Sequence, residues 1–185
     1  MKSINLSDTV MVSDPCYQVP TWCQHKLTGV LPGEYYATVL KSDEGDWGNR
    51  IGLLVVIHKD YVDDCANGSL KWRTVKTATI GVDSGQCGIF SMESYRNDSV
   101  FMEPNNFGFT VYAEGDHWYG HMCDRTLCDE QWGSYDSGVV SSSGYGDGSY
   151  RLLVAKYEGK IVGIGIDYLG YKNYAFNTAI DLELA

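Results

Sequence analysis

Hydrophobic and polar residues alternate with a period of two along most of the chain, which is the pattern of half-buried β-strands. One continuous apolar run, residues 51–57, also has the length of a strand. The strands predicted from these patterns are residues 10–12, 35–40, 51–57, 77–82, 88–90, 107–112, 150–157, 161–168 and 180–184.

Turn-forming residues separate the predicted strands. The polar residues 41–46 lie between two strands, and Glu158-Gly159-Lys160 predicts a tight hairpin between the last long pair. Residues 134–149 are rich in glycine, serine and tyrosine, but Val139 and Val140 interrupt this composition. We therefore expect an ordered loop that contains a short strand.

Little of the chain has a helical pattern. Residues 91–100 and 127–132 are expected to form at most a helical turn or two, because neither has an apolar stripe at helical spacing. His117 and His121 are four residues apart and would share a face of a helix. Gly120 and the neighbouring aromatic residues instead favour a strand or a loop there.

Length and composition fit one domain that is built from strands and turns. The chain has 185 residues, 44% of them hydrophobic, which is enough for a packed core. Glycine is frequent (21 residues) and proline is rare (4), while 14 tyrosines and 5 tryptophans favour aromatic-rich strands. We predict a single all-β domain over residues 1–185, a mostly antiparallel sandwich or partly open barrel with at most short helical turns.

The charge of the chain limits its partners. Twenty-four acidic and 14 basic residues give a formal net charge of −10, so the basic surface of a general nucleic-acid binder is not expected. The clustered cations Lys71, Arg73 and Lys76 are expected to be solvated on one face of a strand.

The sequence also predicts where the protein is found. No apolar run reaches the length of a membrane span, and the first residues lack the apolar region of a secretory signal. We therefore expect a cytoplasmic protein with no membrane partner. In that compartment the cysteines are expected to be free thiols, namely Cys16, Cys23, Cys65, Cys87, Cys123 and Cys128.

Three aspartates at the ends of predicted strands form the main candidate site. Asp14, Asp83 and Asp147 each lie close to glycine or proline, and we expect them to converge at one edge of a sheet. Their oxygens would bind the hydroxyl groups of a small polar ligand, or a hard cation. The alternative is that each aspartate only shapes its own turn. The polar residues expected beside them are Ser84, Gln86 and Ser149.

Four short segments carry a resemblance to a known family. They are an early Asp-Pro (14–15), a central Gly-Val-Asp-Ser-Gly-Gln (81–86), a late Ser-Gly-Tyr-Gly-Asp-Gly-Ser-Tyr (143–150) and a final Ile-Gly-Ile-Asp (164–167). This pattern resembles family 4241 of the domains of unknown function, found in bacteria and their phages. The resemblance implies a cytosolic β-rich domain of bacterial or phage origin, and it implies no activity. Residues 103–137 have no counterpart in it.

Histidine and cysteine residues raise the alternative of a zinc site. The candidate ligands are His117, His121, Cys123 and Cys128, and Cys16 and Cys23 would add further soft ligands. No pair of cysteines has the C-x2-C spacing that is typical of structural zinc sites. We therefore predict no metal and no cofactor, and expect these side chains to pack or hydrogen-bond individually.

A cysteine nucleophile is a second chemical alternative. Cys16 lies near Asp14 and Cys87 near Asp83, and either thiol would need a histidine as its base. A neighbouring carboxylate raises the pKa of a thiol and so disfavours the reactive thiolate.

Aromatic residues gather in the loop-rich stretch between residues 114 and 149. Trp118, Tyr119 and Tyr145 are predicted to contact a ligand or partner, because tyrosine and tryptophan offer a large contact area at low entropic cost. The alternative is that these side chains belong to the core at one end of the sheet.

Taken from the sequence, the expected function is binding without catalysis. The partner would be a host or cellular protein, or a small polar ligand that the protein sequesters. If the coding genome is a phage, the chain would be an accessory or anti-defence protein that acts in the host cytoplasm. A metal- or cysteine-dependent hydrolase is the alternative. An acidic nucleic-acid mimic is a third hypothesis, which requires the carboxylates to lie in one patch.

Overall fold

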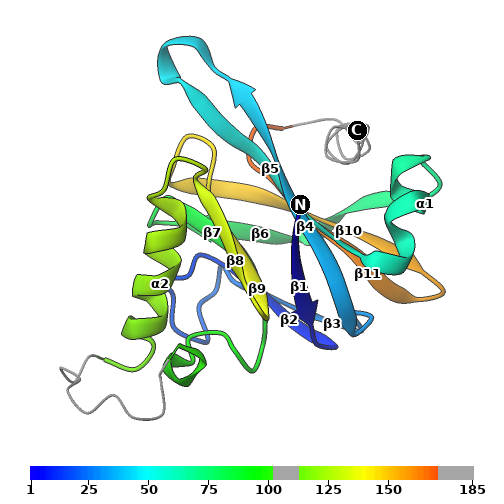
Figure 1. Cartoon of the computed structure of the whole chain (residues 1–185), viewed down its shortest axis with the longest axis horizontal. Coiled ribbons are helices and arrows are strands. Elements are labelled where there is room, and N and C mark those ends of the chain that lie inside the picture. Colours follow the sequence, from blue (N-terminus) through cyan, green and yellow to red (C-terminus); the bar gives the residue numbers. More distant parts are fainter. Residues whose placement is uncertain (102–112, 171–185) are drawn as a thin grey trace.

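The computed structural model describes residues 1–101 and 113–170, and strands dominate it (Figure 1). About 50% of these residues lie in strands and 16% in helices, so the prediction of an all-β fold is confirmed. The strands within the described ranges form two antiparallel sheets, and these do not close into a barrel. The strands predicted at residues 107–112 and 180–184 lie outside the described residues.

The larger sheet, sheet A, pairs six strands from the two halves of the chain. In spatial order they are β1 (Lys2–Leu6), β4 (Gly33–Asp43), β5 (Asn49–His58), β11 (Lys160–Asp167), β10 (Gly148–Tyr157) and β6 (Trp72–Val82). Every neighbouring pair in this order is antiparallel. The strands β1 and β6 therefore form the edges of the sheet.

The smaller sheet, sheet B, contains five strands. In spatial order they are β3 (His25–Thr28), β2 (Thr9–Ser13), β7 (Gln86–Ser91), β9 (Gly138–Ser142) and β8 (Trp132–Tyr135). These pairs are also antiparallel. Strand β9 is the short strand expected at Val139 and Val140.

The main core lies between the two sheets. Val10 and Val12 on β2 are buried against residues of sheet A that include Ile164 and Ile166 on β11. The spacing of two in each pair places both side chains on the inner face of their strand. Each such side chain contributes about 1.5–3 kcal/mol when it is fully buried.

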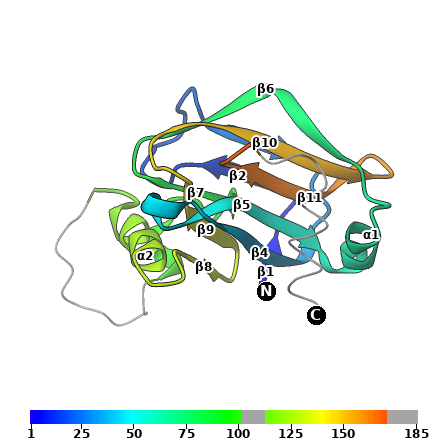
Figure 2. The same ribbon diagram turned by 90° about the horizontal axis from the view of Figure 1, so that it is seen from above.

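The outer faces of both sheets are covered by helices, which Figures 1 and 2 show on opposite sides of the molecule. The helix α1 (Val62–Ala66) follows the 3-10 helix η2 (Lys59–Tyr61) and packs on sheet A through Val62 and Cys65. The helix α2 (Asp116–Thr126) covers sheet B. Among the described residues, no helix has both the length and the apolar character needed to cross a membrane.

Helix α2 corrects the expectation of a strand or loop around His117 and His121. Trp118, Met122 and Thr126 are buried at a spacing of four, so they form one stripe that packs on sheet B. Gly120 has open space around it and lies on the exposed side of the helix, where it disturbs no packing. The narrow stripe, set among polar residues, explains why the helical pattern was missed.

The remaining departures from prediction involve short elements. The strands β1, β3 and β8 were not predicted, because each has only four or five residues and includes polar ones. Residues 91–100 contain one 3-10 turn, η3 (Asp98–Val100), and residues 127–132 contain no helix. The predicted hairpin at Glu158 and Gly159 is confirmed, and both residues have the positive φ angles of a two-residue turn (47° and 81°).

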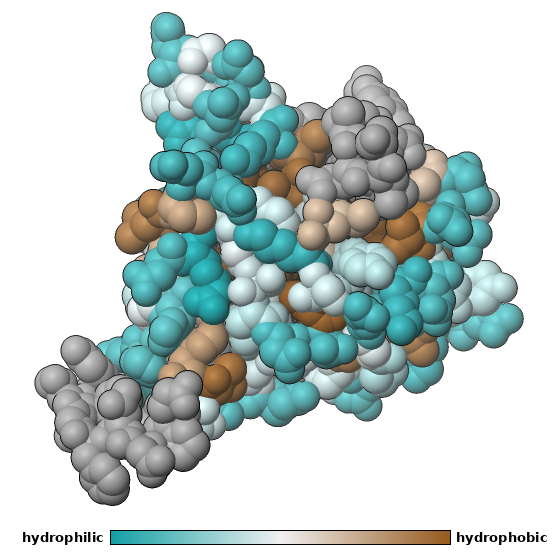
Figure 3. All heavy atoms as spheres, in the orientation of Figure 1, coloured by the Kyte–Doolittle hydropathy of each residue, from teal (hydrophilic) through white to brown (hydrophobic). Residues whose placement is uncertain are grey.

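The turn predicted at residues 41–46 lies at the tip of a long hairpin. Strand β4 continues to Asp43, and the chain then forms the 3-10 helix η1 (Gly45–Trp47) before β5 begins. This hairpin projects from the top of the molecule in Figure 3, where its tip is largely hydrophilic or neutral.

Candidate functional site

Two connections between the sheets lie side by side at one end of the sandwich. The turn Asp83-Ser84-Gly85 leads from β6 in sheet A to β7 in sheet B, and residues 143–147 lead from β9 back to β10. The backbone N–H of Ser143 donates to the Gly85 carbonyl (3.0 Å), and the Gly85 N–H donates to the Asp147 carboxylate (3.1 Å). The two connections are thereby joined.

Asp14 joins a third segment to this junction. It follows β2 and accepts hydrogen bonds from the backbone N–H groups of Cys16 (2.8 Å), Asp83 (2.8 Å) and Ser84 (2.7 Å), and from the Ser84 hydroxyl (2.6 Å). The structure therefore brings the three aspartate segments together. The role of Asp14 differs from the expected one, because its side chain is fully buried (0% exposed) and both oxygens are occupied. It anchors the turn and does not face a ligand.

The loop that connects β2 to β3, residues 14–24, is fixed by Tyr95. The Tyr95 hydroxyl lies 2.7 Å from the carbonyl oxygen of Tyr17 and 3.0 Å from that of Asp14. The side-chain amide of Gln24 donates to the same hydroxyl (2.9 Å). Since this hydroxyl is buried, its contacts with the loop backbone are not exposed to competing water.

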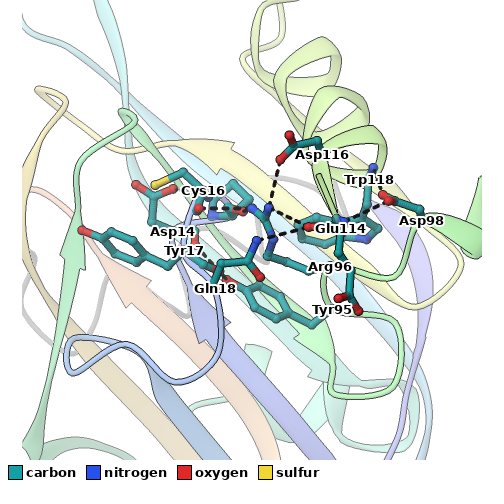
Figure 4. Close-up of polar contacts among 12 residues, drawn as sticks. Asp14, Cys16, Tyr17, Gln18, Tyr95, Arg96, Asp98, Glu114, Asp116 and Trp118 are labelled. Carbon is teal, nitrogen blue, oxygen red and sulfur yellow. Dashed lines mark hydrogen bonds and ion pairs between the residues drawn. The ribbon is translucent and has the colours of Figure 1, made fainter. Parts of the chain in front are cut away.

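Arg96 connects the same loop to α2, as Figure 4 shows. Its guanidinium group donates to the carbonyl oxygens of Pro15 (2.9 Å) and Cys16 (3.1 Å). On the other side it donates to the Glu114 carbonyl (3.3 Å) and forms an ion pair with Asp116 (3.2 Å) at the start of α2. The buried guanidinium therefore fixes the loop relative to the helix.

Close packing against β6 completes the shape of the loop. The Gly81 N–H on β6 donates to the Cys23 carbonyl (3.2 Å). A Cβ atom at position 81 would lie only 2.7 Å from the Cβ of Cys23, so this approach requires glycine. The two glycines of Gly-Val-Asp-Ser-Gly therefore have different roles. Gly81 allows the close approach of Cys23, and Gly85 adopts the positive φ (69°) of the turn.

An open cleft of about 580 Å³ lies between this loop and the junction. Tyr17 and Trp22 line it from the loop, and Asp83, Asp147 and Ser149 line it from the junction. Trp22 is 88% exposed, which is unusual for so large an apolar side chain. We call this the Trp22 cleft.

Tyr17 is a neutral hydroxyl donor inside the Trp22 cleft. Burial raises its pKa, and interactions with the Asp83 carboxylate and the Cys23 thiol raise it further. The phenol therefore keeps its proton at neutral pH and can donate a hydrogen bond. Asp83 and Asp147 are both exposed at their tips, so their remaining lone pairs face the cleft and solvent.

Of the residues predicted from sequence, Asp83, Asp147 and Ser149 line the cleft, and Ser84 lies behind it on Asp14. Tyr17 and Trp22 were not predicted. A tryptophan in a short polar loop after Val19-Pro20-Thr21 is the sequence feature that could have revealed this wall, because such a position is unsuited to a core residue.

Gln86 and Tyr119 lie together on the α2 side of the junction, away from the Trp22 cleft. The Gln86 amide donates to the Cys123 sulfur (3.4 Å), and its oxygen is buried without a hydrogen-bond partner among the described residues. Burial and the nearby Cys123 thiol raise the pKa of Tyr119 to about 12. The structure therefore does not join these two residues with the carboxylates in one ligand site.

The other two predicted aromatic residues lie apart from the cleft. Tyr145 is exposed, but its ring packs edge-on against Trp47 at 6.0 Å and its hydroxyl bonds to Glu44. Trp118 is fully buried and packs against Phe90 at 5.0 Å and Tyr95 at 5.2 Å. Trp118 is a core residue and has no surface with which to contact a ligand.

The candidate zinc ligands do not converge. His117 and His121 are neighbours on α2, with ring centroids 4.8 Å apart, in a shallow groove lined also by Asp116 and Asp124. Cys123 instead faces Gln86, and Cys128 is exposed beyond the helix. In the part of the chain that the structure describes, no three His, Cys, Asp or Glu side chains are grouped to hold a metal ion.

No disulfide bond is assigned to any of the six cysteines, all of which lie in the described residues. Burial and the adjacent Asp14 carboxylate raise the pKa of Cys16 to about 12. Complete burial also raises the pKa of Cys87, and Asp14 adds to the shift. Both thiols are therefore protonated at neutral pH, which is unsuited to a nucleophile.

The order of thiol reactivity tests this electrostatic picture. Iodoacetamide at about pH 8 should alkylate the exposed Cys128 first and Cys16 much more slowly, because only the thiolate reacts. Stability should also fall as pH rises from 9.0 toward 12, since the unfolded chain releases the Cys16 proton while the folded chain retains it. Peptide mass spectrometry measures the rates, and Cys16 reacting as fast as Cys128 would contradict the assignment.

Comparisons with known proteins found no matching family model, no matching curated protein and no matching solved structure. The resemblance to family 4241 therefore stays a prediction.

Proposed function

We propose that this chain is a non-enzymatic binding protein that takes a small polar ligand in the Trp22 cleft. The observation that carries the proposal is an exposed tryptophan beside two exposed carboxylates in a cleft of about 580 Å³. This volume lies within the range of roughly 300–1,000 Å³ that small-molecule sites occupy. A rigid junction of three chain segments supports the cleft, so little ordering is needed when a ligand binds.

The chemistry of the cleft defines the class of ligand. Asp83, Asp147 and the Ser149 hydroxyl offer hydrogen-bond acceptors, so the ligand must present hydroxyl or ammonium donors. The flat faces of Trp22 and Tyr17 favour a ligand with an apolar face or a cationic centre that packs on an aromatic ring. A hydroxyl- or amine-bearing small molecule satisfies both requirements.

This proposal is favoured over hydrolysis. The raised pKa values of Cys16 and Cys87 keep both thiols protonated, so the cysteine-dependent alternative has no activated nucleophile at these positions. Binding without turnover also agrees with a role in sequestering a ligand. If the chain is encoded by a phage, one of the two origins that the family resemblance implies, the ligand would be a small molecule of the host cell.

Trp22→Ala is expected to weaken ligand binding by about tenfold or more, because it removes the largest contact surface of the cleft. The melting temperature should change little, since the exposed ring contributes little to the core. Native mass spectrometry of wild-type and variant protein, each incubated with the low-molecular-mass fraction of a bacterial lysate, measures which ligands are retained.

Trp47→Ala is the matched control, because Trp47 is also exposed but lies on η1 and does not line the cleft. It should retain the same ligands as the wild type. Asp147→Ala should reduce retention as Trp22→Ala does. Equal retention by wild type and Trp22→Ala, or no ligand on the wild type from any lysate, would refute the proposal.

A further inference from the structure

A second cleft, of about 510 Å³, lies at the far end of the same two strands that border the Trp22 cleft. Lys71, just before β6, and Arg73, near its start, line one side of it. Val154, Lys156 and Gly159 line it from β10 and the hairpin that follows. We call it the basic cleft. Its lining combines three cations with a buried apolar side chain, and no acidic residue of the described ranges lines it.

Strand pairing fixes the relative positions of these side chains. Arg73 pairs directly with Val154 in the antiparallel ladder, so the two side chains lie on one face of sheet A. Val154 belongs to the core between the sheets, while Arg73 is exposed. The basic cleft therefore lies on the inner face of sheet A, where that face becomes accessible to solvent.

The cations of the basic cleft are not neutralised within the described ranges. None of Lys71, Arg73 and Lys156 forms an ion pair there, although acidic residues outnumber basic ones in the chain by 24 to 14. Lys71 donates a hydrogen bond to the Gly68 carbonyl, its one hydrogen-bond partner among the residues that the structure describes. Glu158, which precedes Gly159, lies near Tyr61: burial raises the pKa of the Tyr61 hydroxyl, and the charge of Glu158 adds to the shift. Tyr61 packs with the cluster under α1 on the outer face of the sheet.

Protection of a sheet edge explains only part of this arrangement. Exposed lysines on an edge strand prevent pairing with other chains, and Lys71, Arg73 and Lys76 at the edge strand β6 fit that role. Lys156 does not, because β10 is an interior strand that pairs with both β6 and β11. A cation placed there beside two others, across a paired strand, increases their mutual repulsion unless an anion binds.

We infer that the basic cleft binds a compact, multiply charged anion of the phosphate class. The guanidinium of Arg73 offers a planar pair of donors that matches phosphate oxygens, and the two lysines add mobile positive charges. The volume suits a phosphorylated small molecule. A long nucleic acid is disfavoured, because the net charge of −10 repels a polyanion that extends beyond the cleft.

Titration with inorganic pyrophosphate tests the inference on the full chain. We expect binding at low ionic strength that weakens as salt is added, measured by isothermal titration calorimetry. In a ¹H–¹⁵N spectrum the Gly159 amide and the Arg73 Nε–H signals should shift during the titration. Arg73→Gln and Lys156→Gln should each weaken the affinity by about tenfold or more, because each removes a charge-assisted contact.

Lys76→Gln is the matched control, since it removes the same charge from the same strand outside the cleft. This variant should leave the affinity for pyrophosphate within about twofold of wild type, because solvent and salt screen the charge of Lys76 from an anion bound in the cleft. Trp22→Ala should also leave it unchanged, which separates this site from the Trp22 cleft. Absence of pyrophosphate binding, or an equal loss in Lys76→Gln and Arg73→Gln, would overturn the inference.

Discussion

Replacing Asp14 with alanine is expected to lower the free energy of unfolding by about 3–5 kcal/mol. The fully buried carboxylate accepts three backbone N–H groups and the Ser84 hydroxyl. Without it, these donors lose their acceptor, and each unsatisfied buried donor costs about 1–3 kcal/mol. The turn between β6 and β7 would also lose its attachment to the end of β2. Urea unfolding followed by circular dichroism measures the change.

Two further variants calibrate this effect. Asp14→Asn keeps one oxygen for the N–H groups of Asp83 and Ser84, but its amide nitrogen cannot accept the N–H of Cys16, so a loss of about 1.5–3 kcal/mol is expected. Asp147→Ala removes an exposed carboxylate that accepts one hydrogen bond, from the Gly85 N–H. It should lower the free energy of unfolding by about 0.5–1.5 kcal/mol. If Asp147→Ala is as damaging as Asp14→Ala, Asp14 does not have the anchoring role assigned to it.

The difference between these aspartates also shows what sequence alone can predict about the site. Each aspartate ends or precedes a strand near a glycine or proline, so the local pattern was the same for Asp14 and Asp147. Only the topology decides which carboxylate is enclosed. Asp14 lies where β2 meets the turn between the sheets, whereas Asp147 lies at the rim of the cleft. Convergence was predictable from strand ends, but burial was not.

The long central strands were predictable because apolar residues occupy most positions over the length of a strand. Strands β5 and β11, for example, have side chains that are buried along nearly their whole length. The strand β3 was missed because only Leu27 of its four residues is buried, which leaves no alternation to detect. Its strand conformation depends on pairing with β2, a tertiary interaction that a local pattern does not contain.

The cleft residues Tyr17 and Trp22 were missed for a related reason. Their loop has no regular pattern, and its shape depends on distant contacts with Tyr95, Arg96 and Gly81. These partners lie about sixty to eighty residues away in the chain. Local secondary-structure propensities do not predict contacts over such a separation. Two of the aromatic residues predicted as ligand contacts, Trp118 and Tyr119, lie on a helix that the sequence did not indicate.

Trp118→Ala is the second substitution with a large expected effect, a loss of about 3–5 kcal/mol in the free energy of unfolding. The indole is fully buried between α2 and sheet B and contacts the rings of Phe90 and Tyr95. Its removal leaves a cavity and weakens the attachment of the whole helix, since Trp118 is the largest residue of the buried stripe. Urea unfolding with an unchanged m-value would establish the loss.

Trp47→Ala provides the comparison, because it deletes the same side chain at an exposed position and should change the stability by about 0.5 kcal/mol or less. A Trp118→Ala variant with wild-type stability would mean that the indole is not part of the core, and would restore it as a candidate for ligand contact. If Trp118→Ala is strongly destabilised while Trp22→Ala is not, the two tryptophans have separate roles. Trp118 then stabilises the packing of α2 on sheet B, and Trp22 contributes to ligand binding in the cleft without stabilising the fold.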